Sequence, residues 1–140
     1  MLVRKALGGQ YLDPYGFYTN LYQGKKMSQK LELPSYENID AEEMAAKIGL
    51  NAKHIPILVQ SFREESTQII ASLEAAIAQK DYSEIGNTAH SIKGSAGNLK
   101  FDAMYELAKE VELSAKANKE DYPYEAACTS LKNAILSIKI

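Results

Sequence analysis

The stretch that decides the fold of this chain runs from Ala89 to Leu99 and reads AHSIKGSAGNL. With successive helical residues about 100° apart, its apolar positions fall on one narrow stripe, which continues back to residue 85. Apolar residues that recur at intervals of three and four are typical of a helix with one face in a core. The members of the stripe are Ile85, Ala89, Ile92, Ala96 and Leu99.

His90 lies on the other side of this predicted helix, roughly 140° from the centre of the stripe by the same arithmetic. Lys93 follows one turn later on the side of the histidine. Three glycines, Gly86, Gly94 and Gly97, fall on that side too, although a glycine inside a helix costs about 1 kcal/mol relative to alanine. Because glycine leaves the backbone bare, the pattern predicts an exposed imidazole, a nearby cation and a clearing where a large partner docks.

These residues resemble the signature of the histidine-containing phosphotransfer (HPt) domains of two-component phosphorelays. That signature is a histidine followed by lysine at the third position, glycine at the fourth and small residues afterwards. Here His90, Lys93 and Gly94 occupy these positions, and the likeness extends more loosely over residues 38–140. Many members have glycine ten positions after the histidine, where the helix ends. This chain has Lys100 there, so the resemblance leaves the helix end undefined.

The resemblance implies that His90 accepts a phosphoryl group from the phosphoaspartate of a receiver domain and passes it to another receiver. The implied partners are response-regulator receiver domains and a hybrid sensor kinase, with Mg²⁺ held by the receiver and no cofactor of the chain's own. Lys93, as an i, i+3 neighbour, would offset the phosphoryl charge. The sequence has neither a glycine-rich nucleotide loop nor an acidic cluster beside His90, so we expect a phosphoryl carrier and not an autonomous enzyme.

Glu112, 22 residues after the histidine, has two interpretations. In the phosphorylated module of chemotaxis kinases, which is similar to HPt domains, an acidic residue at this spacing binds the second ring nitrogen of the histidine and would fix its tautomer. The alternative is a solvated glutamate on a helix face. Two rival functions also stay open: a chemotaxis-kinase-type module phosphorylated by a kinase domain in trans, and a helical adaptor that carries no phosphoryl group.

The remaining sequence predicts more helices. Apolar residues recur every three or four positions in four long segments, 52–79, 82–99, 103–117 and 121–139, and a short helix is expected at 41–48. Short loops between the long segments favour an antiparallel up-down four-helix bundle. The predicted fold class is therefore all-α, with a short extra N-terminal helix and an irregular N-terminal extension.

Polar residues that precede these segments are expected to cap them. They are Asp40, Asn51, Asp81 and Asp102. The single cysteine, Cys128, falls on an apolar helix position and is expected to be a buried small side chain with no disulfide and no metal.

Residues 1–37 form a Tyr-rich extension, distinct from the predicted bundle domain at 38–140. Its tyrosines are expected to pack on the bundle or on a neighbouring molecule, without a role in phosphotransfer. Met27, which follows two lysines, is a candidate native start, and residues 1–26 would then be non-native.

Composition excludes several classes of function. The 140 residues suit one domain, and an apolar fraction of 46% is enough for a packed core. A net charge of −2 gives no electrostatic case for nucleic acid. The sequence has no apolar run long enough to span a membrane and no apolar core of a secretory signal, so a cytoplasmic location is expected.

Overall fold

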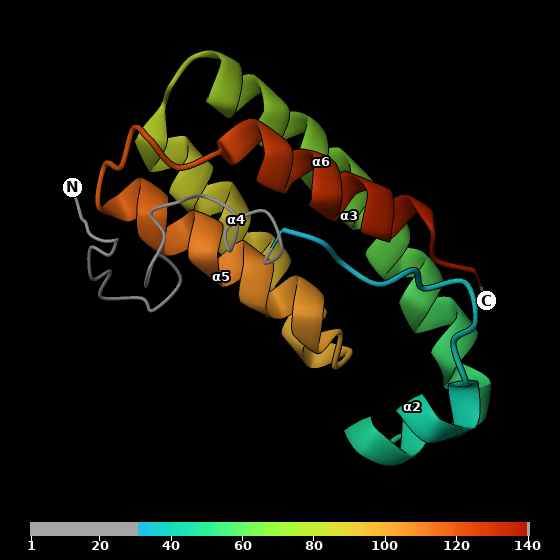
Figure 1. Cartoon of the computed structure of the whole chain (residues 1–140). Helices are drawn as coiled ribbons and strands as arrows, with labels where there is room; N and C mark the ends of the chain where they lie inside the picture. The colour runs from blue at the N-terminus through green and yellow to red at the C-terminus, as the bar shows by residue number, and fades with distance from the viewer. Residues whose placement is uncertain (1–30, 140) are drawn as a thin grey trace. The chain divides into compact units, whose positions relative to one another are not determined.

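The computed structural model describes residues 31–139, in which all the regular elements are helices and there is no strand. From Leu33 onward the chain forms one compact unit. The predictions for the tyrosines before residue 31 and for a start at Met27 lie outside the described residues. In chain order the elements are α2 (Ala41–Ile48), the 3-10 turn η2 (Ala52–His54), α3 (Ile55–Ala78), α4 (Tyr82–Asn98), α5 (Asp102–Lys116) and α6 (Tyr124–Leu136) (Figure 1).

The four long helices enclose the core of this helical bundle. Each packs against the next in the chain, and α6 also packs back against α3 (Figure 1). The predicted apolar stripe of α4 is confirmed, because all five of its members are at most 7% exposed. Burying a large aliphatic side chain contributes about 1.5–3 kcal/mol relative to leaving it in water. The largest fully buried side chains include Val59, Leu73, Ile85, Ile92, Met104, Leu107, Leu131 and Ile135.

Cys128 lies in this core on α6, as its place in the apolar pattern predicted. Its side chain is buried, and this burial raises the pKa of the thiol to about 11. A thiol with a raised pKa carries little thiolate at neutral pH, so Cys128 packs as a small apolar residue.

Two of the four predicted caps begin the helices for which they were predicted. The side chain of Asp40 accepts hydrogen bonds from the backbone N–H groups of the first turn of α2. The side chain of Asp81 accepts one at 3.1 Å from the backbone N–H of Glu84 in α4. Asn51 instead caps η2, so α3 begins three residues later than predicted. The prediction for Asp102 is wrong: it is the first residue of α5, after Phe101.

Three helices end on a residue other than glycine with a left-handed backbone. These residues are Lys80 (φ 55°), Lys100 (φ 63°) and Asn118 (φ 55°). At the end of α4, the N–H of Lys100 donates to the carbonyl of Gly97 at 3.1 Å, and the N–H of Phe101 donates to the carbonyl of Ala96 at 3.0 Å. This pair of bonds is the Schellman motif, which satisfies carbonyls at the helix end. Lys100 therefore ends the helix as glycine would, at the expense of an unfavourable φ.

We predict that Lys100→Gly stabilises the chain by about 0.5–1 kcal/mol, because glycine adopts a left-handed backbone without steric strain. Urea unfolding followed by circular dichroism measures this change. The matched control is Glu106→Gly at an exposed position inside α5, which should cost about 1 kcal/mol. Destabilisation by both substitutions would contradict the assignment of strain to Lys100.

Helix α6 ends at Leu136, three residues before the predicted end, because the residues that follow bond to another segment. The N–H of Tyr36 donates to the hydroxyl of Ser137 at 2.9 Å, and the N–H of Lys139 donates to the carbonyl of Tyr36 at 3.1 Å. The ring of Tyr36 packs on that of Phe101, with centroids 4.8 Å apart. The chain just before α2 is thereby tied to the end of α6.

Candidate functional site

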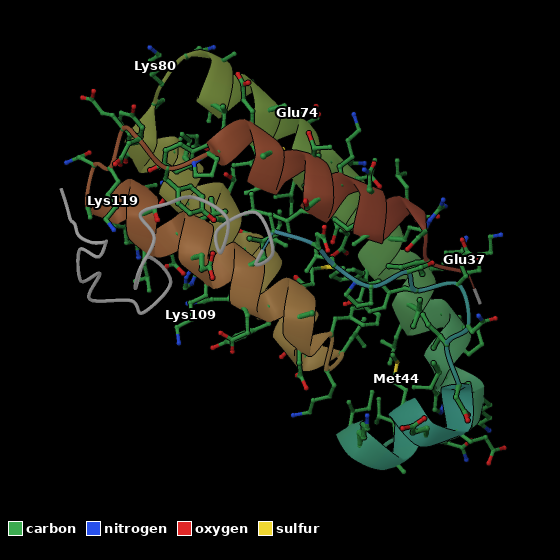
Figure 2. All side chains as sticks on the ribbon, viewed as in Figure 1. Glu37, Met44, Glu74, Lys80, Lys109 and Lys119 are labelled. Carbon is green, nitrogen blue, oxygen red and sulfur yellow. The ribbon has the colours of Figure 1, made fainter. Side chains whose placement is uncertain are left out.

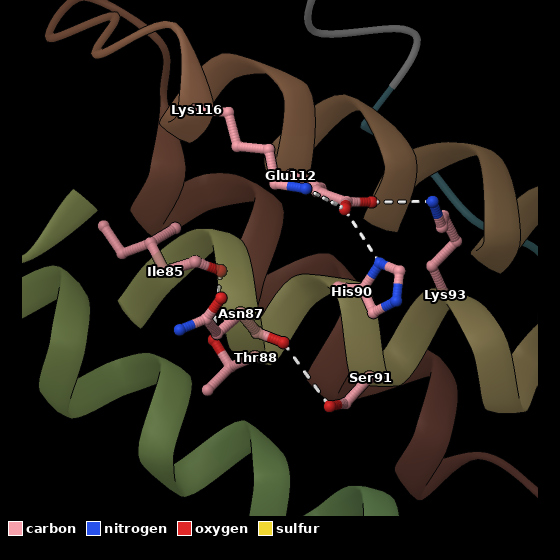
Figure 3. A network of polar contacts seen from close by, with 8 residues as sticks. All are labelled: Ile85, Asn87, Thr88, His90, Ser91, Lys93, Glu112 and Lys116. Atoms are coloured by element: carbon pink, nitrogen blue, oxygen red, sulfur yellow. Dashed lines mark hydrogen bonds and ion pairs between the residues drawn. The ribbon is translucent and has the colours of Figure 1, made fainter. Parts of the chain in front are cut away.

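His90 on α4 and Glu112 on α5 face each other across the contact between these two helices (Figure 3). The Nδ1 atom of His90 lies 2.8 Å from Oε2 of Glu112. The His90 side chain is 63% exposed, whereas that of Glu112 is only 4% exposed. The interpretation of Glu112 as a solvated surface glutamate is therefore wrong, and the geometry is that of a carboxylate bound to the histidine ring.

Two lysines hold the same carboxylate from opposite sides (Figure 3). The Nζ atom of Lys93 lies 2.8 Å from Oε1 of Glu112, and that of Lys116 lies 2.8 Å from Oε2. Lys93 was predicted to neutralise charge near His90, and its ammonium is here paired with Glu112. Lys116 is the site residue that the sequence analysis missed, although its i, i+4 spacing from Glu112 is a signal for a helical ion pair.

Glu112 is ionised at neutral pH. Burial raises the pKa of its carboxyl, but hydrogen bonds from Lys116, Lys93 and His90 lower it more, and the balance holds the pKa at about 2, below the ordinary 4.5. An ionised carboxylate can only accept hydrogen bonds. We therefore assign the proton between the two side chains to Nδ1 of His90, because the ionised carboxylate of Glu112 carries none.

With Nδ1 protonated, the lone pair of the neutral imidazole is on Nε2. This second nitrogen lies on the side of the ring that faces away from Glu112 (Figure 3). The site thus presents one nucleophilic nitrogen to solvent, with the ring oriented by a buried anion and two lysines close by.

The three glycines predicted to form a docking clearing differ in their surroundings. A Cβ atom added at Gly94 would meet nothing within 4 Å, whereas one at Gly97 would lie 3.1 Å from the ring of Tyr105. Gly86 is buried, and a Cβ there would lie 3.5 Å from Cγ of Lys116. The prediction of exposure is wrong for Gly86, and Gly97 is half-buried, because α5 and its side chains cover that flank of α4. The open part of the clearing is Gly94.

Comparison with known proteins identifies the family of this chain. The model of the Hpt domain family matches residues 57–138, which include nearly all of the four long helices. The chain belongs to the Hpt domain family. No curated protein and no solved structure matches it. Hpt domains serve phosphotransfer in two-component signalling, and they interact with receiver domains and kinases.

In the part of this Hpt domain that the structure describes, no group of three or more His, Cys, Asp or Glu residues is placed to hold a metal ion. The same residues contain no helix with the length and hydropathy needed to cross a membrane.

The lowered pKa of Glu112 predicts a loss of stability in acid. A carboxyl whose pKa is depressed by folding stabilises the native state above its unfolded pKa, and that contribution disappears as the pH falls through the folded pKa. Between pH 4.5 and about 2 the domain should lose on the order of 3 kcal/mol through Glu112. Urea unfolding of the wild type and of Glu112→Gln over this range measures it. The two stabilities should converge as the pH falls, and a difference independent of pH would contradict the assignment.

Proposed function

We propose that this Hpt domain accepts a phosphoryl group on Nε2 of His90 from the phosphoaspartate of a receiver domain and passes it to an aspartate of another receiver. The observation that carries the proposal is the bond between Nδ1 of His90 and the buried Glu112, which leaves the exposed Nε2 as the free nucleophile. The proposed partners are response-regulator receiver domains and a hybrid sensor kinase, and the proposed location is the cytoplasm.

The transfer step needs no general base, because no proton has to leave His90. The lone pair of Nε2 attacks phosphorus, the bond from phosphorus to the aspartyl oxygen breaks, and the aspartate leaves as a carboxylate. The proton on Nδ1 stays in place, so the phosphorylated ring gains one positive charge beside the negative charge of Glu112. The negative charge of Glu112 stabilises this cationic ring, so the bond to Glu112 favours acceptance. Because the proton stays on Nδ1, the ring leaves as neutral imidazole when the group moves on.

Phosphoryl transfer depends mainly on positioning and on neutralising charge. Lys93, one turn from His90 on the same helix, is proposed to stabilise the phosphoryl group. The receiver would supply Mg²⁺ and the remaining charges, so the domain acts as a carrier whose catalysis is shared with its partner.

We further propose that the four long helices alternate in direction as an up-down bundle. The connections 79–81, 99–101 and 117–123 are too short to return the chain along a helix. Figure 2 supports this order, because Lys80 after α3 and Lys119 after α5 lie at one end of the bundle, away from Met44.

A second candidate function is phosphorylation in trans by an ATP-bound kinase domain, as in chemotaxis kinases. The observation that favours it is again the bond between His90 and Glu112, since an acidic partner at this spacing is the feature by which the sequence resembles that module. The chemistry at Nε2 would be the same, with ADP leaving in place of the receiver aspartate.

Two parallel incubations separate these functions. In one, the domain is mixed with receiver domains phosphorylated by a small-molecule phosphodonor; in the other, with ATP and a histidine-kinase domain. Label transferred from receivers at the faster rate supports the relay, and label that appears only with ATP and the kinase supports the second function. No label in either incubation, with receivers still bound, would leave the adaptor function.

We predict that Gly94→Leu slows transfer from a receiver by about tenfold or more, a loss of at least about 1.4 kcal/mol of interaction. Space around Gly94 is open, so leucine should obstruct docking while it stabilises α4 by about 1 kcal/mol. The control is Ala71→Leu on the exposed face of α3 near α6. Transfer at the wild-type rate in Gly94→Leu would show that receivers do not dock over this glycine.

A further inference from the structure

Two lysines share one buried carboxylate at this site. Oε1 of Glu112 is paired with Lys93 and Oε2 with Lys116, while the second oxygen also accepts from Nδ1 of His90. The two lysine ammonium groups carry one positive charge more than the single carboxylate neutralises. That surplus is available to a second anion.

Lys116 reaches Glu112 over the backbone of Gly86, one turn before His90 on α4. A Cβ added at Gly86 would lie 3.5 Å from Cγ of Lys116, in ordinary contact, so the lysine stem rests where the glycine leaves the helix bare. Lys93 lies one turn after His90. The two ammonium groups therefore approach Glu112 from opposite directions along α4, with His90 between them (Figure 3).

Lys93 and Lys116 differ in exposure and in the helix that carries them, which fits one role for Lys93 toward the phosphoryl group and another for Lys116 toward Glu112. The side chain of Lys93 is 23% exposed and on the same helix as His90, whereas that of Lys116 is 59% exposed and anchored on α5. A phosphoryl group on Nε2 would add about two negative charges on the open side of the ring. If Lys93 turns toward that group, Oε1 of Glu112 loses its ion-pair partner. A buried carboxylate left without a cation is strongly unfavourable.

We propose that Lys116 is a positioning residue that keeps Glu112 charged and bonded to Nδ1 of His90 while Lys93 pairs with the phosphoryl group. This inference rests on the proposed function, because it assigns the second cation of the same site. Lys116 itself does not touch the phosphoryl group. It acts through Oε2 of Glu112, the oxygen that accepts the hydrogen bond from Nδ1 of His90.

The test compares Lys116→Met, which keeps much of the stem but removes the charge, with Lys116→Arg, which keeps the charge. The control is Lys132→Met, which breaks another ion pair between lysine and glutamate, with Glu74, on the far pair of helices α3 and α6. One readout is the titration of the Glu112 carboxyl by ¹³C NMR in the unphosphorylated domain. The other is the rate of phosphoryl transfer from a receiver.

In Lys116→Met, Glu112 should protonate at a higher pH than the wild-type value of about 2, and transfer should slow by about tenfold, the factor that loss of one charge-assisted hydrogen bond supplies. Arginine should restore both quantities, and the control should change neither.

An unchanged titration or an unchanged transfer rate in Lys116→Met would overturn the inference. A Lys93→Met variant that transfers at the wild-type rate would also overturn it, because Lys93 would then not pair with the phosphoryl group during transfer. A wild-type domain that accepts no phosphoryl group from any donor would overturn the proposed function instead. The titration still decides in that case whether Lys116 holds Glu112.

Discussion

Replacing His90 with glutamine is expected to abolish phosphoryl acceptance completely and to leave the fold intact. Glutamine can still donate a hydrogen bond toward Glu112, but its amide nitrogen has no lone pair available to attack phosphorus. Incubation with a labelled phosphoryl donor measures the loss. The wild type should carry label that is lost in acid and kept in base, as phosphohistidine is, and the variant should carry none.

Stability should change by no more than about 1 kcal/mol in His90→Gln, because the side chain is 63% exposed and Glu112 keeps both of its lysines. The matched control is His54→Gln on η2, which removes the other, exposed histidine and should accept label like the wild type. Acid-labile label on His90→Gln would place the phosphoryl group on another residue and refute the assignment of the nucleophile.

The second large effect is expected from Ile92→Asp, which should unfold the domain. Ile92 is fully buried in the stripe of α4, two residues from His90. The substitution removes a large aliphatic side chain from the core and puts a carboxylate there without a partner. Together these changes should cost more than about 4–5 kcal/mol, a large part of the 5–15 kcal/mol that stabilises a typical domain.

Circular dichroism and a urea titration measure this effect, and Ser91→Asp on the adjacent exposed position is the control. The control should stay folded, because its carboxylate remains in water. Ile92→Asp should fail to accept label because it is unfolded, whereas His90→Gln should fail while folded. A folded Ile92→Asp domain would contradict the placement of the stripe in the core.

The apolar stripe of α4 could be predicted because the spacing of apolar residues along a helix depends on that helix alone. The sequence around His90 repeats this spacing without interruption. The ends of the helices were harder, since they depend on other parts of the chain. Helix α6 stops early because Ser137 and Lys139 bond to Tyr36, and α3 starts late because Asn51 caps a 3-10 turn. A local pattern contains neither contact.

The same distinction separates the site residues. His90, Lys93 and Gly94 could be placed from one helix. Glu112 had two interpretations until the register of α4 against α5 was known, because burial of a glutamate depends on what covers it. That register also explains Gly86: what reads as an exposed glycine on a helical wheel lies beneath the stem of Lys116.

The bond between Tyr36 and Lys139 brings two residues at opposite ends of the folded unit within 3.1 Å, measured from the nitrogen to the oxygen. A unit whose ends are adjacent can be inserted into a surface loop of another protein with little distortion of its host. Its chain can also be circularly permuted, with a short linker joining these ends and new termini opened in the connection 117–123. The four helices would keep their packing through either rearrangement.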